Sequence, residues 1–95
     1  MTEREGARLL VSGRMTIDSI ATLLKIGLQP ADKTGLVIDL ARVEGVDSAA
    51  VSLLLIWLRQ SRRSGLDLCF ANIPENLSSL IRLYGVMDML PLCRD

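Results

Sequence analysis

Residues 37–58, VIDLARVEGVDSAAVSLLLIWL, decide the fold of this chain. They continue an apolar segment, residues 36–40, through a brief loop to Asp47 and Ser48, where a helix begins that is apolar on almost every side. A nearly continuous apolar run is typical of a strand covered on both faces, and Asp and Ser are favoured at helix starts. Asp39 interrupts the run; because a buried carboxylate needs hydrogen-bond partners, we expect it near the end of the strand.

The sequence before this stretch predicts one strand and one helix. Residues 9–12 predict a strand that ends at Gly13. Apolar residues then recur at helical spacing, and the hydroxyl of Thr16 is expected to cap this first helix. Gly27 and Pro30 are expected to end it.

The sequence after the stretch continues the alternation. The second helix is expected to run to about Ser64 and to stop at Gly65, and residues 66–71 predict the next strand. Pro74 is well placed at the first position of a third helix, which ends at Gly85. Its inward stripe is expected to be Leu77, Leu80, Ile81 and Tyr84. The apolar tail, residues 86–92, is expected to pack back on the fold, which as a whole is an α/β domain.

Length, charge and composition exclude several classes of protein. Ninety-five residues make one domain, residues 1–95. The longest unbroken apolar run, residues 53–58, is far shorter than the roughly 18 residues of a membrane span, and the charged N-terminus lacks a signal-peptide core. We therefore expect a cytoplasmic protein without membrane insertion. Basic and acidic residues balance at 11 each and aromatics are 3% of the chain, which argues against nucleic-acid binding.

The residues that carry most enzyme chemistry are missing. The sequence has no His, the usual general base and the commonest metal ligand, and no glycine-rich phosphate-binding motif. Cys69 is expected to be a small apolar residue in a buried strand and Cys93 to be incidental, since a disulfide is not expected in the cytoplasm. We therefore expect no enzymatic activity, no cofactor and no metal.

The second helix has more apolar residues than one core stripe needs. Placed at about 100° per residue, four of them cluster on one side as a core stripe: Val51, Leu54, Leu55 and Leu58. Leu53, Ile56 and Trp57 fall on the opposite half, with Gln60 among them and Arg59 and Arg63 to one side. An exposed patch of this kind is large for a small monomer. It predicts a partner-binding face centred on Trp57, unless the third helix or the tail covers it.

Asp47 and Ser48 together exceed what a helix start requires. A capping role satisfies backbone N–H groups and accounts for one of the two residues. The other, Ser48, is then a contact hydroxyl or a phosphorylation site. A phosphate would add roughly −1.5 to −2 charges, which the helix terminus tolerates and a partner docked over Leu53 and Trp57 would not.

Several segments resemble a STAS domain. They are the Asp39-Leu40 pair, Val46-Asp47-Ser48, the helix AAVSLLLIWLRQSRRSG, the strand LDLCFANI, and the segments LVSG and LSSLIRLYGV. The resemblance covers about residues 9–92. That family includes anti-sigma-factor antagonists and the small STAS subunit of Mla-type ABC phospholipid transporters. It implies a mixed β-sheet of about four strands with helices packed mainly on one side.

The resemblance also implies roles for Ser48. This residue corresponds to the Ser or Thr that is phosphorylated in the antagonist branch. In the Mla-type branch, the same position and its helix contact a cytoplasmic ATPase subunit that works with a permease in lipid trafficking between membranes. The antagonist branch usually carries D-S-[ST]-G-L, whereas Ala49, Ala50 and Val51 follow Ser48 here. The antagonist branch also tends to carry an acidic pair after the strand before the first helix, and residues 14–16, Arg-Met-Thr, replace it here. The usual first edge strand is either shortened to residues 2–5 or absent.

Two functions follow as hypotheses. The first is a non-enzymatic regulatory or assembly subunit that binds the ATPase of an ABC-type phospholipid transporter and is held at the inner membrane through that partner. It would use Asp47, Ser48 and the outer face of the second helix. The second is an anti-sigma-factor antagonist switched by phosphorylation of Ser48. A weaker alternative is a homodimer through the Trp57 face.

Overall fold

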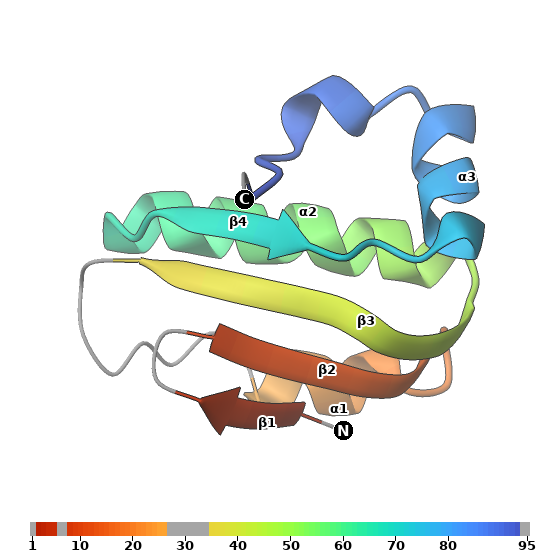
Figure 1. Cartoon of the computed structure of the whole chain (residues 1–95), viewed down its shortest axis with the longest axis horizontal. Coiled ribbons are helices and arrows are strands. Elements are labelled where there is room, and N and C mark those ends of the chain that lie inside the picture. The colour runs from red at the N-terminus through yellow and green to blue at the C-terminus, as the bar shows by residue number, and fades with distance from the viewer. Residues whose placement is uncertain (1, 6–7, 27–34, 94–95) are drawn as a thin grey trace.

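The computed structural model of the chain describes residues 2–5, 8–26 and 35–93 (Figure 1). Strands and helices alternate along most of the chain, as the sequence predicts. The elements are β1 (Thr2–Glu5), β2 (Arg8–Met15), α1 (Ile20–Ile26), β3 (Leu36–Val46), α2 (Ser48–Ser64), β4 (Leu68–Ala71), α3 (Glu75–Leu83) and a short 3-10 helix, η1 (Met87–Met89).

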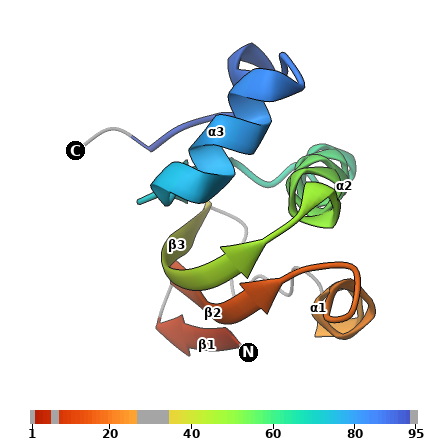
Figure 2. The ribbon, with the colours of Figure 1, turned by 90° about the vertical axis from the view of Figure 1, so that its right-hand side faces the viewer.

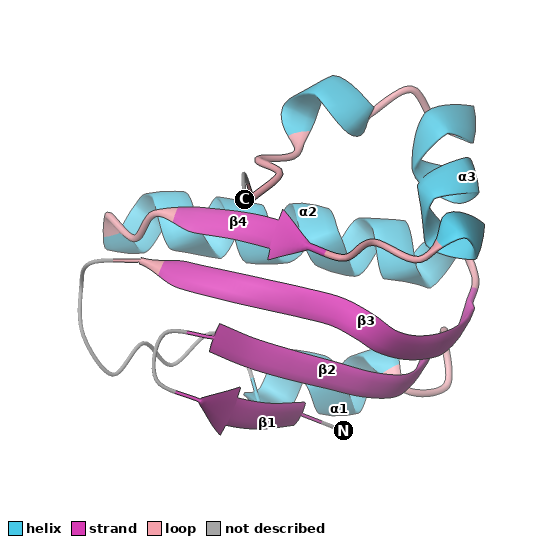
Figure 3. Ribbon diagram, in the orientation of Figure 1, coloured by secondary structure: helices cyan, strands magenta, loops and turns pink. Residues whose placement is uncertain are grey.

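The strands form one four-stranded sheet in the order β1-β2-β3-β4. β1 pairs with β2 antiparallel, while β2, β3 and β4 are parallel. Parallel neighbours need crossover connections, and α1 and α2 supply them on one face of the sheet, behind the strands in Figure 3. α3 follows β4 in the chain and contacts α2 and β3 (Figure 2). These observations confirm a mixed sheet of about four strands with helices mainly on one side.

The two N-terminal strands differ from the expectation. β1 is present as an edge strand, which settles the question left open at residues 2–5. β2 continues past Gly13 to Met15, so the predicted strand end at Gly13 is wrong. Gly13 has a φ of 85°, which glycine adopts without strain. The pairing with β3 changes register directly after it, so Gly13 bends the strand instead of ending it.

β3 is longer than expected and contains the segment predicted as a loop. Two register shifts relative to β2 let β3 carry extra residues before Val46 while the two strands stay paired. The alternation of exposed Arg42, buried Val43 and exposed Glu44 is a strand pattern that the sequence already shows. The shifts bend β3, and the bend delivers the chain to Asp47 at the start of α2 (Figure 1).

The first helix starts later than predicted, and its predicted end lies outside the described residues. Residues 16–19 form a turn in which the Thr16 carbonyl accepts hydrogen bonds from the N–H groups of Ser19 and Ile20, both at 2.9 Å. The predicted capping role of the Thr16 hydroxyl is therefore wrong, because the helix begins at Ile20. Gly27 and Pro30, expected to end the helix, are not among the residues described.

The C-terminal half follows the prediction more closely. α2 ends at Ser64, and Gly65 takes the left-handed conformation with a φ of 68°. α3 follows Pro74 and buries Leu77 and Ile81, but Tyr84 is 51% exposed, so its assignment to the inward stripe is wrong. Tyr84 lies after the last helical residue, where the chain turns at Gly85.

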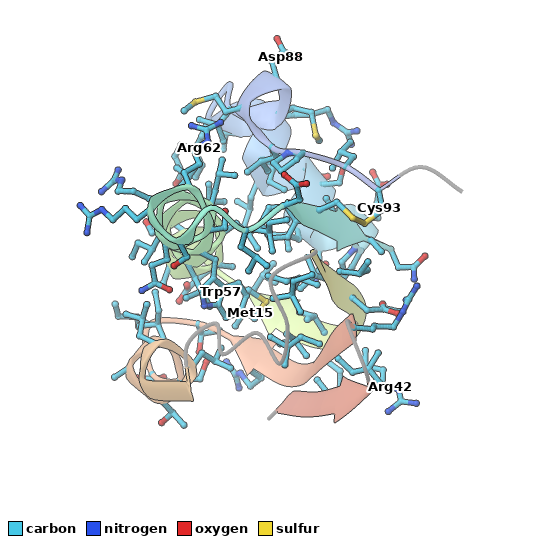
Figure 4. The ribbon with its side chains drawn as sticks, turned by 90° about the vertical axis from the view of Figure 1, so that its left-hand side faces the viewer. Met15, Arg42, Trp57, Arg62, Asp88 and Cys93 are labelled. Atoms are coloured by element: carbon cyan, nitrogen blue, oxygen red, sulfur yellow. A yellow bond between two sulfur atoms is a disulfide. The ribbon has the colours of Figure 1, made fainter. Side chains whose placement is uncertain are left out.

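The cysteines are paired, contrary to the expectation. Cys69 of β4 and Cys93 of the tail form a disulfide across a Cα–Cα distance of 5.0 Å. The tail packs back as predicted, with Leu90 buried and Leu92 bridging to Phe70. This return places Cys93 beside the outer edge of β4 (Figure 4). Sequence separation alone gave no sign of that proximity, so the treatment of Cys93 as incidental is wrong.

Candidate functional site

The predicted apolar docking face on α2 is not a surface. Leu53 and Trp57 have no exposed area, and Ile56 is half-buried. α2 packs on the sheet and also contacts α1 and α3, so the arc it buries is wider than a single core stripe. Figure 4 shows Trp57 on the side of α2 that faces α1. The prediction of an exposed face centred on Trp57, for a partner or for a homodimer, is therefore wrong.

The exposed side of α2 carries other residues. Arg59 and Arg63 are exposed and Gln60 is half-buried, while Leu55, assigned to the core stripe, is only half-buried. Near the beginning of the helix, Ser48 and Ser52 are exposed and lie one turn apart. The accessible stripe of α2 is thus hydroxylic at its N-terminal end and basic at its C-terminal end.

Asp47 is the N-cap of α2. The sequence predicts a capping role for one residue of the Asp47-Ser48 pair. Its Oδ1 accepts a hydrogen bond from the Ala49 N–H at 2.8 Å, which satisfies one of the unpaired donors of the first turn. Its Oδ2 accepts from the Ile17 N–H at 2.9 Å, in the turn before α1. Asp47 is therefore the cap, and the carboxylate also holds the α1 turn against the start of α2.

Ser48 is free of the capping role and lies between two shallow depressions. The depression on the α1 side has a volume of about 370 Å³, and the one on the α3 side about 290 Å³. Both are lined by Ser48 and Ser52, which form the ridge between them. We call this surface the Ser48 face. It consists of Ser48, Ser52, Ile17, Ile20, Leu55 and Tyr84.

The apolar part of the Ser48 face comes from the elements beside α2. Ile17 is 69% exposed on the α1 side, and Tyr84 is 51% exposed on the α3 side, next to Leu83 at 75%. The sequence does not mark Ile17 and Tyr84 as surface positions, because both fit the helical spacing of the apolar residues in α1 and α3. Both lie just outside the helices that the structure shows, and helix boundaries leave little trace in apolar spacing.

The electrostatics of the Ser48 face combine the positive end of a helix with the carboxylate of Asp47. Ser48 begins a helix of 17 residues whose first turn has no acidic residue, and the N-terminal end of a helix attracts anions. The neighbouring carboxylate of Asp47 is occupied by two backbone N–H groups. Within the described residues, no group of three or more potential ligands could hold a metal ion.

A second polar cluster lies on the opposite face of the sheet. Asp39, in the middle of β3 and not at the strand end, accepts hydrogen bonds from Arg8, the Ala41 N–H at 3.0 Å and the Asn72 amide at 3.1 Å. Burial alone would raise the pKa of Asp39. The hydrogen bonds from Ala41, Asn72 and Arg8 and the Arg8 charge outweigh it and lower that pKa. This cluster stabilises the carboxylate of Asp39 within the sheet.

Comparisons with known proteins bear on the family and the fold of the chain. A family model described as "Mlab, STAS domain" matches residues 1–91. The solved structure of the anti-sigma factor antagonist SpoIIAA in its unphosphorylated form is similar to the whole of this chain over 88% of its own length, with a TM-score of 0.70 and 16% sequence identity. At that identity the likeness shows a shared fold. No curated protein matches the chain.

The family model covers nearly the whole chain, including the Asp47-Ser48 pair, the helix that follows it and the tail as far as Pro91. The chain therefore belongs to the family described as "Mlab, STAS domain".

Proposed function

We propose that this protein is a non-enzymatic subunit that binds the cytoplasmic ATPase of an ABC-type phospholipid transporter and supports its assembly or regulation. The observation that carries the proposal is the Ser48 face, an exposed hydroxyl ridge between two depressions with apolar residues on both flanks. The class of partner is part of the proposal, and membership of the family described as "Mlab, STAS domain" supports it. Through the ATPase and its permease, the protein would be held at the inner membrane; in the described part of the chain, no helix is suited to crossing a bilayer.

The Ser48 face offers the elements of a modest interface. Ile17 and Tyr84 present apolar area on either side of the ridge, and aromatic residues are enriched among interface hot spots. The ridge contributes two hydroxyls that can donate and accept hydrogen bonds. Arg59 and Arg63, exposed further along α2, are placed to make polar contacts at the rim.

The test is a calorimetric titration of the purified chain with the ATPase subunit from the same cell, alone and with its permease. Tyr84→Ala is expected to weaken binding about tenfold or more, as hot-spot truncation does. Leu92→Ala is the matched control, because Leu92 is a similarly exposed apolar residue that lines neither depression of the Ser48 face. Equal affinities for Tyr84→Ala and the wild-type chain would remove this face from the interface, and no binding of the wild-type chain would reject the function.

A second function, an anti-sigma-factor antagonist switched at Ser48, is favoured by one observation. Ser48 is exposed at the mouth of α2, where a phosphate would meet the positive end of the helix. Incubation with the partner kinase and ATP, followed by intact-mass measurement, tests it. A gain of one phosphoryl group that is lost in Ser48→Ala supports this function, and an unchanged mass rejects it.

A further inference from the structure

β4 is hydrogen-bonded on one side to β3 and on the other side to the C-terminal segment. β3 pairs with β4 from Leu36↔Leu68 to Asp39↔Ala71. On the other side, the Phe70 N–H donates to the Pro91 carbonyl at 2.8 Å, and the Cys93 N–H donates to the Phe70 carbonyl at 2.9 Å. The C-terminal segment therefore covers the outer edge of the sheet, which would otherwise present unpaired backbone groups.

The contacts that hold this segment are few. From residue 90 to residue 93, only Leu90 is buried, while Leu92 is 48% exposed. A depression of about 250 Å³ opens beside the segment. It is lined by Cys93 of the segment and by residues of other elements, among them Arg8 and Ile73. Segments with few buried apolar contacts belong to the least stable parts of a fold. The Cys69–Cys93 bond is the covalent link that fixes this segment to β4.

The bond lies where a reductant can reach it. Cys69 and Cys93 are both half-buried. Cys69 alternates along β4 with Phe70, which faces the helices, so Cys69 points to the face of the sheet that α1 and α2 leave open. Figure 4 shows the disulfide on that side, away from α1 and α2.

We infer that Cys69 and Cys93 are a redox-exchangeable pair whose disulfide holds the C-terminal segment against the edge of β4. Reduction of this bond by a dithiol releases the segment from that edge. The inference rests on the proposed function in one respect, the cytoplasmic compartment, where disulfides are usually transient and redox-sensing. A thiolate of the reductant attacks one sulfur of the pair and forms a mixed disulfide, and the other cysteine leaves as a thiolate and takes up a proton. The second thiol of the reductant then attacks the mixed disulfide and releases the remaining cysteine. Two electrons and two protons pass to the protein, and the reductant becomes a disulfide.

Two backbone amides report whether the segment is fastened. The N–H groups of Phe70 and Cys93 are the ones that join β4 to the segment, so their hydrogen exchange is slow only while the segment is in place. The segment's release would leave the amides inside α2 unchanged, because their hydrogen bonds are within the helix.

The experiment uses the full chain alone, first oxidised in a glutathione redox buffer and then treated with dithiothreitol under native conditions. Intact mass should rise by two hydrogens on reduction. Exchange at the Phe70 and Cys93 amides should become at least tenfold faster, with α2 unchanged. The control is the C69A/C93A variant, which cannot form the bond. With or without dithiothreitol, its amides at residues 70 and 93 should exchange as fast as those of the wild-type chain after reduction.

Four results would overturn the inference. They are free thiols after oxidation, reduction that requires denaturant, unchanged exchange at Phe70 and Cys93, or an equal acceleration throughout α2, which would make the bond a support for the whole fold. The ATPase is absent from this experiment, so its outcome is distinguishable from success or failure of the proposed function.

Discussion

The Asp47 carboxylate accepts the Ile17 backbone N–H at 2.9 Å while its other oxygen caps α2 through Ala49. One side chain thus sets the relative position of the ridge and one flank of the Ser48 face. The ridge of Ser48 and Ser52 belongs to α2, and the exposed side chain of Ile17 belongs to the turn before α1. The geometry of the proposed docking surface therefore depends on a residue that lies at its edge and makes its contacts within the chain.

Asp47→Ala is expected to lower the free energy of unfolding by about 1–2 kcal/mol. Loss of an N-cap alone costs about 1 kcal/mol, and the bond from Ile17 is lost with it. Asp47→Asn separates the two bonds, because Asn keeps the cap on Ala49 while its amide nitrogen cannot accept the Ile17 N–H. Urea denaturation of the three proteins measures the difference, and Asp47→Asn should lie between the wild-type chain and Asp47→Ala. A stability of Asp47→Ala equal to that of the wild-type chain would show that Asp47 does not hold this corner.

Trp57 is expected to matter for stability instead of partner binding. It has no exposed area, and within the described residues its Nε1–H has no hydrogen-bond acceptor. Truncation of a buried Trp to Ala costs about 3–5 kcal/mol, so Trp57→Ala should lose a large part of the stability of a small domain.

Trp57→Phe separates the ring from the N–H. It keeps most of the buried aromatic volume and removes a donor whose burial without an acceptor costs about 1–3 kcal/mol. Its loss of unfolding free energy should therefore be clearly smaller than that of Trp57→Ala, and its affinity for the ATPase should equal that of the wild-type chain. A folded Trp57→Phe protein with a weakened affinity would contradict the assignment of Trp57 to the core.

Some features of α2 can be predicted from the sequence and others cannot. The start, the end and the apolar character of this helix were predictable, because caps and apolar runs are local signals. Which of its apolar residues are exposed was not, since the answer depends on α1 and α3 packing against the same helix. Asp47 and Ser48 lie at the start of α2, where the sequence places them, whereas Leu53 and Trp57 are buried. The exposed apolar residues beside Ser48 are instead Ile17 and Tyr84. The disulfide escaped prediction for a similar reason, because only the return of the tail along β4 brings Cys93 to Cys69.

Asp39 is expected to make the stability of the protein fall in acid. Its pKa is lowered in the folded state, so the unfolded chain binds more protons as the pH drops. The contribution is fully present above the unfolded pKa of about 3.9 and is lost as the pH falls through the lower folded value. Asp39→Asn should cost about 2 kcal/mol at pH 7, the range for hydrogen bonds to a charged group. Its urea midpoint should change less than that of the wild-type chain between pH 6 and about pH 3. Parallel pH profiles for the two proteins would contradict this role.

Reduction of the disulfide is expected to lower the free energy of unfolding by clearly less than about 3 kcal/mol. A cross-link between residues 24 apart in sequence stabilises a fold by about that amount when its reduction frees only the unfolded chain. Here the released segment also regains freedom in the folded protein, so most of that effect cancels. Urea denaturation of the oxidised chain, the reduced chain and the C69A/C93A variant measures the difference, and the last two should agree closely. A loss of about 3 kcal/mol or more on reduction would contradict a release confined to the C-terminal segment.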